Sequence, residues 1–289
     1  MDSLLDSIGE WIRQGLIDAI MGAFTTMFDA INTQVGEVAA QVGRTPEAWN
    51  PGVFSMIRTL SETVILPVAG MILTFVLCYE LIQMIVDRNN MHDFETWIFF
   101  KWIFKTFCAT YILSNTFNIV MSVFALAQNV VNQSAGLITG TLDIGNPAAM
   151  SAFLVQLEAM SVWELLGLYM EVSIVALCIA AMSICVFIVV YGRLIEIYMT
   201  VSIAPIPLST MVNREWGTMG NIYLKALFAL AFQAFLIMVC IAIYAVLIAG
   251  ITAADSIHAA IWGCAGYTAL LCFTLFKTGS ISKSLFAAH

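Results

Sequence analysis

Charged residues are scarce in this sequence: they make up 10% of its 289 residues, whereas an ordinary soluble domain carries about 25%. Hydrophobic residues make up 61%, and the mean hydropathy is +0.93. So little charge cannot cover a globule in water, which excludes a soluble protein. The apolar residues form continuous runs, and one helical span needs about 20 of them. The sequence therefore predicts an all-α, multi-pass membrane protein with about five transmembrane helices.

Motifs that signal catalysis are also missing. The sequence contains no G-x-x-x-x-G-K-[ST], H-E-x-x-H, G-x-S-x-G or G-x-G-x-x-G pattern. Its three histidines, His92, His258 and His289, are too far apart in the predicted topology to share a metal. Seven cysteines lie in or beside apolar runs and form no C-x-x-C pair. We predict no enzymatic activity, no cofactor and no metal site.

Basic residues are absent from two long stretches, 106–192 and 226–276. Beyond residue 62 they form three clusters: Arg88, Lys101 and Lys105; Arg193, Arg214 and Lys225; Lys277 and Lys283. Lysine and arginine are retained on the cytoplasmic side of membranes, so all three clusters are expected inside the cell. The prediction is a cell-membrane protein with its N-terminus outside and its C-terminus in the cytoplasm.

Residues 1–62 form a predicted extracytoplasmic segment that is rich in acids. Over residues 3–35, apolar residues recur every three or four positions, which is typical of an amphipathic helix. This face comprises Leu4, Ile8, Trp11, Ile12, Leu16, Ile20, Phe24, Met27, Phe28 and Ile31. Lipid-binding helices usually have basic polar faces, so the acidic face favours packing on a partner or on the bundle over lying on the membrane surface. Over 36–62 we expect a loop that leads into a short helix from about Val53.

Residues 63–289 form the predicted transmembrane domain. Its spans are expected over 63–86, 106–127, 165–191, 226–249 and 259–276. Between two of them, residues 194–212 contain Pro205 and Pro207, which remove two backbone donors within three residues. Such a break is tolerated at membrane depth only where protein or water covers it. We favour a re-entrant or surface-lying helical hairpin here over a kinked sixth span.

Polar residues inside or beside spans are expensive and therefore functional candidates. The candidates are Glu80, Glu171, Glu196, Lys101 and Lys105. Each also lies within a few turns of a predicted boundary, so simple snorkelling to the interface is the alternative. Glu80 is expected to reach the inner interface or to meet Lys101 or Lys105.

Several segments, taken in order, resemble one protein family. They are Leu66-Pro67 with ELIQMIVDRNNMHDFETW at 80–97; YGR at 191–193, APIP at 204–207 and NREWG at 213–217; QAF at 233–235; and FTLFKTGS at 273–280. Together they are similar to the TrbL-type, or sixth-VirB-component-type, polytopic subunit of type IV secretion systems. The likeness is strongest to the branch on Gram-positive conjugative transposons, and it extends over nearly the whole chain.

The resemblance implies a channel or platform subunit of a conjugation machine. Such a subunit forms a homo-oligomeric ring, joins other membrane subunits and the secretion ATPase within membrane lipid, and helps to pass single-stranded DNA with its relaxase out of the donor. The family has no catalytic residues to transfer to this chain. A structural scaffold that lines no path is an alternative, as is a small-solute secondary transporter.

We further expect residues 194–225 to form an inner rim that contacts the ATPase or the substrate. The residues assigned to this rim are Arg193, Glu196, Pro205, Pro207, Arg214, Trp216, Gly217 and Lys225. Arg193, Arg214 and Lys225 would supply positive charge, the prolines a fixed bend, and Trp216 an anchor. The alternative is that these residues only hold the topology at the lipid headgroups.

Overall fold

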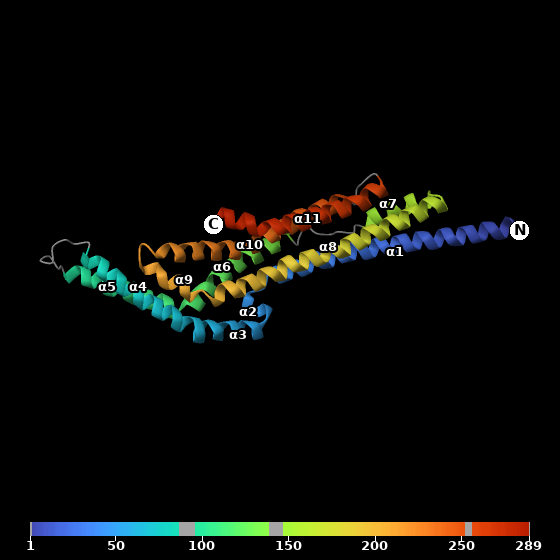
Figure 1. The fold of residues 1–289 in the computed structure, drawn as a ribbon. Helices are drawn as coiled ribbons and strands as arrows, with labels where there is room; N and C mark the ends of the chain where they lie inside the picture. Colours follow the sequence, from blue (N-terminus) through green and yellow to red (C-terminus); the bar gives the residue numbers. More distant parts are fainter. Residues whose placement is uncertain (1, 87–95, 139–146, 252–255, 289) are drawn as a thin grey trace. The chain divides into compact units, whose positions relative to one another are not determined.

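A computed structural model describes residues 2–86, 96–138, 147–251 and 256–288, and every regular element in these ranges is a helix. The helices are α1 (Asp2–Val42), α2 (Pro46–Trp49), α3 (Pro51–Leu60), the π-helical turn η1 (Ser61–Ile65), α4 (Leu66–Val86), α5 (Thr96–Ser114), α6 (Thr116–Ile138), α7 (Pro147–Glu158), α8 (Val162–Ser202), α9 (Pro205–Ser209), the 3-10 turn η3 (Thr210–Val212), α10 (Gly217–Ile251) and α11 (Ile257–Leu285) (Figure 1). Outside the described ranges lie residues 87–95, which include Arg88, His92 and part of the 80–97 segment quoted for the family resemblance. His289 also lies outside them.

Within the described ranges, four helical stretches are long and apolar enough to cross a membrane: Pro51–Val86, Val162–Val212, Gly217–Ile251 and Ile257–Leu285. A fifth crossing is available if Phe99–Ser114 and Thr116–Ser134, which meet at an angle of 68°, form one broken span. These helices confirm the predicted all-α, multi-pass architecture.

The chain forms two compact units, which are described separately. Unit 1 consists of residues 1–43, 131–190 and 235–278, and unit 2 consists of residues 44–130, 191–234 and 279–289.

In unit 1, the long helix α1 packs its apolar face against other helices of the same chain. Phe24 is fully buried and stacks on Phe153 of α7, with ring centroids 5.5 Å apart. The Ser183 hydroxyl of α8 donates to Gln34 at 3.1 Å. From Ile17 to Val42 the face is buried in this way, as the bundle-packing interpretation expects, while Trp11 near the start of α1 is 78% exposed.

Most of residues 36–52 are helical, so the loop predicted there is wrong, whereas the short helix predicted from about Val53 is present as α3. Helix α1 continues to Val42, and the prolines expected to break the chain instead begin helices. Thr45 caps α2 by accepting from the Ala48 amide, and Asn50 caps α3 by accepting from the Val53 amide. Proline suits the first helical position because the missing N–H would have no partner there. Helix α3 then continues through η1 into α4, so the helical stretch that contains the first predicted span begins at Pro51.

In unit 2, the second predicted span is broken near its middle, at Asn115. Three consecutive side chains bond to the carbonyl four residues back: Ser114 to Thr110, Asn115 to Tyr111 and Thr116 to Ile112. Such bonds compete with the helix ladder and bend helices. The 68° bend between α5 and α6 follows from this polar triplet.

Replacing the triplet should therefore straighten the span. In the variant Ser114→Ala, Asn115→Leu, Thr116→Val, a continuous helix is expected to lengthen the distance between spin labels at the exposed positions Phe107 and Leu126 by about 5 Å, from the helical rise of about 1.5 Å per residue. Pulsed electron paramagnetic resonance in a background without native cysteines measures this distance. The matched control is Asn118→Leu, one turn beyond the break, which should leave the distance unchanged. An unchanged distance in the triple variant would show that tertiary packing alone sets the bend.

The helix that contains the third predicted span, residues 165–191, extends beyond that span. Helix α8 passes through Tyr191 and Arg193 without interruption and ends at Ser202. The first residue able to stop it is Pro205, because proline lacks an amide donor and crowds the preceding turn.

The carbonyls left free by Pro205 and Pro207 are satisfied within the turn. The Ala204 amide donates to the Val201 carbonyl, and the Ile206 amide donates to the Ile203 carbonyl. Helix α9 is almost wholly buried and packs on α4 and α5. Protein therefore covers the broken backbone, as burial at membrane depth requires.

Candidate functional site

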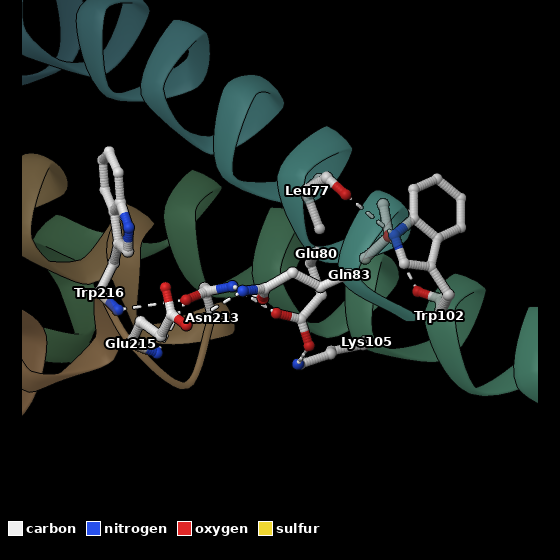
Figure 2. A network of polar contacts seen from close by, with 9 residues as sticks. Leu77, Glu80, Gln83, Trp102, Lys105, Asn213, Glu215 and Trp216 are labelled. Atoms are coloured by element: carbon white, nitrogen blue, oxygen red, sulfur yellow. Dashed lines mark hydrogen bonds and ion pairs between the residues drawn. The ribbon is translucent and has the colours of Figure 1, made fainter. Parts of the chain in front are cut away.

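The turn at residues 213–216, between η3 and α10, is held by one buried asparagine. Asn213 is 1% exposed, and its side-chain oxygen accepts from the amides of Glu215 at 2.8 Å and Trp216 at 3.2 Å. An asparagine oxygen before a helix satisfies amide donors that have no partner inside the helix. Asn213 thus fixes how the chain reverses from α9 into α10 (Figure 2).

The same asparagine joins this turn to α4. Its amide group donates to Glu80 at 2.6 Å and to Gln83 at 3.2 Å. Gln83 in turn donates to Glu215 at 3.1 Å, and Glu80 forms an ion pair with Lys105 of α5. Figure 2 shows the resulting chain of contacts, which we call the Asn213 network: Glu80, Gln83, Lys105, Asn213 and Glu215. It links three segments that are distant in sequence.

An aromatic cluster lies beside the network. Trp216 is 43% exposed, and its ring lies 5.7 Å from that of Phe75 and 6.4 Å from that of Tyr79. On the other side of α4, the Trp102 indole donates to the Leu77 carbonyl at 3.2 Å (Figure 2). Indole rings with one polar contact are suited to the membrane–water boundary. Trp216 and Trp102 therefore fit an interfacial position for the network.

An apolar core next to the Asn213 network fixes the helices that carry it. Buried residues of α4 and α5 form one core, against which Ile206 of α9 and Val212 of η3 also pack. The members of this core are Ala69, Leu73, Leu77, Ala109 and Leu113. This core places α9 and η3 so that the 213–216 turn meets α4 at Glu80.

Close packing between η3 and α10 requires glycine. A Cβ atom at Gly220 would lie 2.7 Å from the Pro207 carbonyl oxygen and would collide with Met211. At Gly217 a Cβ would lie 3.2 Å from the Met211 carbonyl oxygen. Gly217 belonged to the predicted rim, whereas Gly220 did not, because a lone glycine inside an apolar helix gives no signal of its own.

The predicted rim residues do not all lie together at the surface. Arg193 is 7% exposed, and its Nε donates to the Leu230 carbonyl at 3.4 Å, so it cannot present its charge to a partner. Glu196 pairs with Lys283 at 3.1 Å. Pro205 and Pro207 are buried, while Arg214 and Lys225 are exposed. The exposed positive charge of the rim therefore comes from Arg214 and Lys225.

The other intramembrane candidates have different surroundings. Glu80 meets Lys105, one of the two lysines anticipated for it, and Lys101 is exposed. Glu171 belongs to unit 1, where it contacts His258 at 2.6 Å. The described residues contain no group of three or more His, Cys, Asp or Glu side chains able to hold a metal. The role that fits the Asn213 network is to fix the 213–216 turn, with Arg214 and Trp216 exposed on it.

Four residues of this arrangement besides Gly220 were not among the predicted site residues: Tyr79, Gln83, Asn213 and Glu215. Gln83 follows Glu80 by three residues and therefore shares its helix face, which was the available signal. Tyr79 donates to Glu215 at 3.3 Å, but nothing in the sequence pairs positions 136 residues apart.

Fold and site together define a polytopic helical membrane protein with a polar turn docked on an apolar helix bundle. The chain belongs to the TrbL/VirB6 plasmid conjugal transfer-like family, whose model matches residues 31–205, more than half of its length. It is therefore a component of conjugal transfer, that is, of a type IV secretion system. The matched range includes Glu80, Lys105, Arg193 and Pro205, and it ends before the 213–216 turn. No curated protein and no solved structure matches the chain.

Proposed function

We propose that the chain is a channel or platform subunit of the conjugation machine, which helps single-stranded DNA and its relaxase to leave the donor cell. The family match over residues 31–205 carries this proposal. The subunit would sit in the cell membrane as a homo-oligomeric ring with the other membrane subunits and the ATPase. Its N-terminus would face outwards and its C-terminus the cytoplasm, as the distribution of lysine and arginine predicts.

The charge balance supports a conduit rather than a static DNA-binding module. Nucleic-acid binders replace the counterions around phosphate with lysine and arginine, but this chain has 11 such residues against 19 acids. A path for a polyanion must allow easy exit as well as entry. A wall with little positive charge meets that requirement.

Within this function, the 213–216 turn and the start of α10 form the inner rim. The Asn213 network fixes the turn while leaving Arg214, Trp216 and Lys225 exposed. Two exposed basic side chains and an indole held by this network are suited to bind an acidic protein partner or the translocating substrate. Arginine and tryptophan are enriched among the hot-spot residues of protein interfaces.

The double variant Arg214→Gln, Lys225→Gln should lower conjugation by about tenfold or more, since a loss of about 1.4 kcal/mol at an interface corresponds to a factor of ten. Plasmid transfer frequency measures the effect, and membrane fractionation checks insertion. Both side chains are exposed, so the fold should be unaffected.

The matched control removes two other exposed bases, Arg44→Gln and Lys277→Gln, and should leave transfer unchanged. Unchanged transfer in the rim variant would refute the proposed role of the rim.

Two experiments separate the channel from the alternative functions. Crosslinking of transiting DNA to this subunit would favour a channel over a scaffold. Solute uptake by liposomes that contain the purified chain would favour a transporter.

A further inference from the structure

Helix α1 presents a polar face on the side that is not packed against unit 1. Positions three or four apart share one side of a helix, and the exposed residues of this side follow that spacing. We call them the α1 polar face: Gly15, Asp18, Gly22, Thr25, Thr26, Asp29, Asn32, Thr33, Gly36 and Glu37. The face has three acids and no base, and it contains no Val, Leu, Ile, Met or aromatic residue. No neighbouring helix of the described chain comes within 4 Å of the Cβ positions of Gly22 and Gly36, so the face is open there.

Two contacts show that α1 runs parallel to α8 within unit 1. Near the start of α1, the Arg13 guanidinium donates to the Glu158 carbonyl, four residues before α8 begins at Val162. Further along, Gln34 accepts from the Ser183 hydroxyl of α8 at 3.1 Å. The two contact points are 21 residues apart on α1, which matches the 21 residues from the start of α8 to Ser183. Both helices therefore advance in the same direction (Figure 1).

The contact at Ser183 lies at membrane depth. Helix α8 is uncharged between Glu171 and Arg193, and Ser183 is 12 residues from the first and 10 from the second. At about 1.5 Å of rise per residue, both charges are at least about 15 Å away along the helix, which is half of a hydrocarbon core of about 30 Å. Next to this point the Cys272 thiol of α11 donates to the Met182 carbonyl at 3.4 Å, so a second apolar helix passes at the same level.

Two acids of the α1 polar face share this depth. Asp29 is five residues before Gln34 and Glu37 is three residues after it, which is about 8 Å and about 5 Å along the helix axis. Within the described ranges, neither carboxylate forms an ion pair. A charged side chain at this depth is costly against lipid and is found facing water or protein instead.

The same bundle has a different face that suits lipid. This apolar face of α8 is turned away from Ser183, and its members are between 52% and 73% exposed: Ile174, Leu177, Ile184 and Ile188. They lie at the depth of Asp29 and Glu37, yet they are wholly apolar. Unit 1 thus has an apolar outer face on α8 and a polar outer face on α1.

We propose that the α1 polar face lines the water-filled path of the channel, with one copy of the helix contributed by each subunit. This inference rests on the proposed function, to which it adds the surface that the translocating substrate passes. It places part of the segment predicted as extracytoplasmic inside the membrane, where water in the path solvates the acids.

The acids also explain why a gap remains between the copies. Around a rotation axis every subunit presents the same residues to the centre, so the Asp29 side chains of all copies face one another. Like charges repel strongly where no water separates them, and a solvated gap avoids this repulsion. An acidic wall also repels the phosphates of DNA, which permits passage without tight binding.

Cysteine accessibility in donor cells tests this assignment. Thr25→Cys and Thr33→Cys introduce thiols on the α1 polar face, and Leu177→Cys and Ile184→Cys are matched controls on the apolar face of α8. A charged, membrane-impermeant methanethiosulfonate should modify the first pair at least about tenfold faster, because thiols react as thiolates, which form in water and are disfavoured in hydrocarbon. The chain with its seven native cysteines, treated in parallel, gives the background.

The charge of the face provides a second measurement. A cationic reagent should modify Thr33→Cys about tenfold faster than an anionic one, after correction for their rates with a free thiol, because an acidic surface concentrates cations. Adding Asp29→Asn should reduce this ratio. Adding Glu10→Gln should not, since position 10 is about 35 Å away on the same helix, beyond a Debye length of about 8 Å.

Modification of Thr33→Cys with a bulky reagent should also remove most plasmid transfer, whereas the same treatment of Leu177→Cys should not. Equal reaction of the two pairs would overturn the assignment. So would no reaction at Thr25→Cys and Thr33→Cys, because lipid or a partner protein would then cover α1. Modification without loss of transfer would overturn it as well, since the path would lie elsewhere. In each of these cases the proposed function is decided separately, by the crosslinking of transiting DNA to this subunit.

Discussion

Gly220→Ala is expected to destabilise the purified protein by about 1–3 kcal/mol, the usual range for overpacking a close contact. The new methyl group would lie 2.7 Å from the Pro207 carbonyl oxygen, which is backbone and cannot swing away. It would also collide with Met211, so α10 would have to separate from α9 and η3. The melting temperature in detergent, followed by the reactivity of buried cysteines, measures the loss.

Gly250→Ala is the matched control, because Gly250 lies in the same helix α10 and nothing approaches its Cβ position within 4 Å. There the change should be neutral or stabilising, since alanine favours a helix over glycine by about 1 kcal/mol. If both variants melt alike, the close approach at Gly220 contributes nothing to stability.

The composition and charge of the sequence were enough to predict the class of fold. Long uncharged runs can only be buried in lipid or in each other, and the predicted spans 63–86, 226–249 and 259–276 fall within the long apolar helical stretches Pro51–Val86, Gly217–Ile251 and Ile257–Leu285. The contact of Glu80 with Lys105 was also anticipated, because an acid close to the end of a span needs an opposite charge nearby.

Breaks in helices were harder to place than helices. Pro46 and Pro51 were taken as signals of a loop before residue 53, but both begin helices behind side-chain caps. Conversely, no proline or glycine marks the break at Asn115, which comes from three side-chain bonds to the preceding turn. Hydropathy averages over such local competition and therefore cannot detect it.

The candidate site was predicted only in part, because burial depends on which helices meet. Arg193 was grouped with Arg214 and Lys225 by charge, yet α8 continues past it and buries it against Leu230. The polar segment around Asn213 was recognised, but its partners Glu80 and Gln83 lie 133 and 130 residues away. Pairings at that separation arise from the tertiary fold and leave no local pattern.

The hydrogen bond between Asn213 and Glu80 predicts that substitutions at these two positions will have coupled effects on stability. In Asn213→Asp the side-chain oxygens can still accept from the amides of Glu215 and Trp216, so the turn keeps its cap. The donor to Glu80 is lost, and a second carboxylate now stands in its place, where the bonded atoms are 2.6 Å apart in the native protein. We expect a loss of about 2–4 kcal/mol, because an unsatisfied buried group costs about 1–3 kcal/mol and like charge adds to it. Thermal unfolding in detergent at neutral pH measures this loss.

The second change Glu80→Gln should restore most of that stability, although by itself it removes the ion pair with Lys105. In the double variant the new amide at position 80 would donate to the new carboxylate at position 213, and Lys105 would face that relocated negative charge. The coupling between positions 80 and 213 should therefore exceed about 1 kcal/mol, the scale found for residues that share a hydrogen-bond network. Additive losses in the double variant would show that the turn is held by its apolar core alone. In that case the rigid presentation of Arg214 and Trp216 would have to come from α9 and η3 instead.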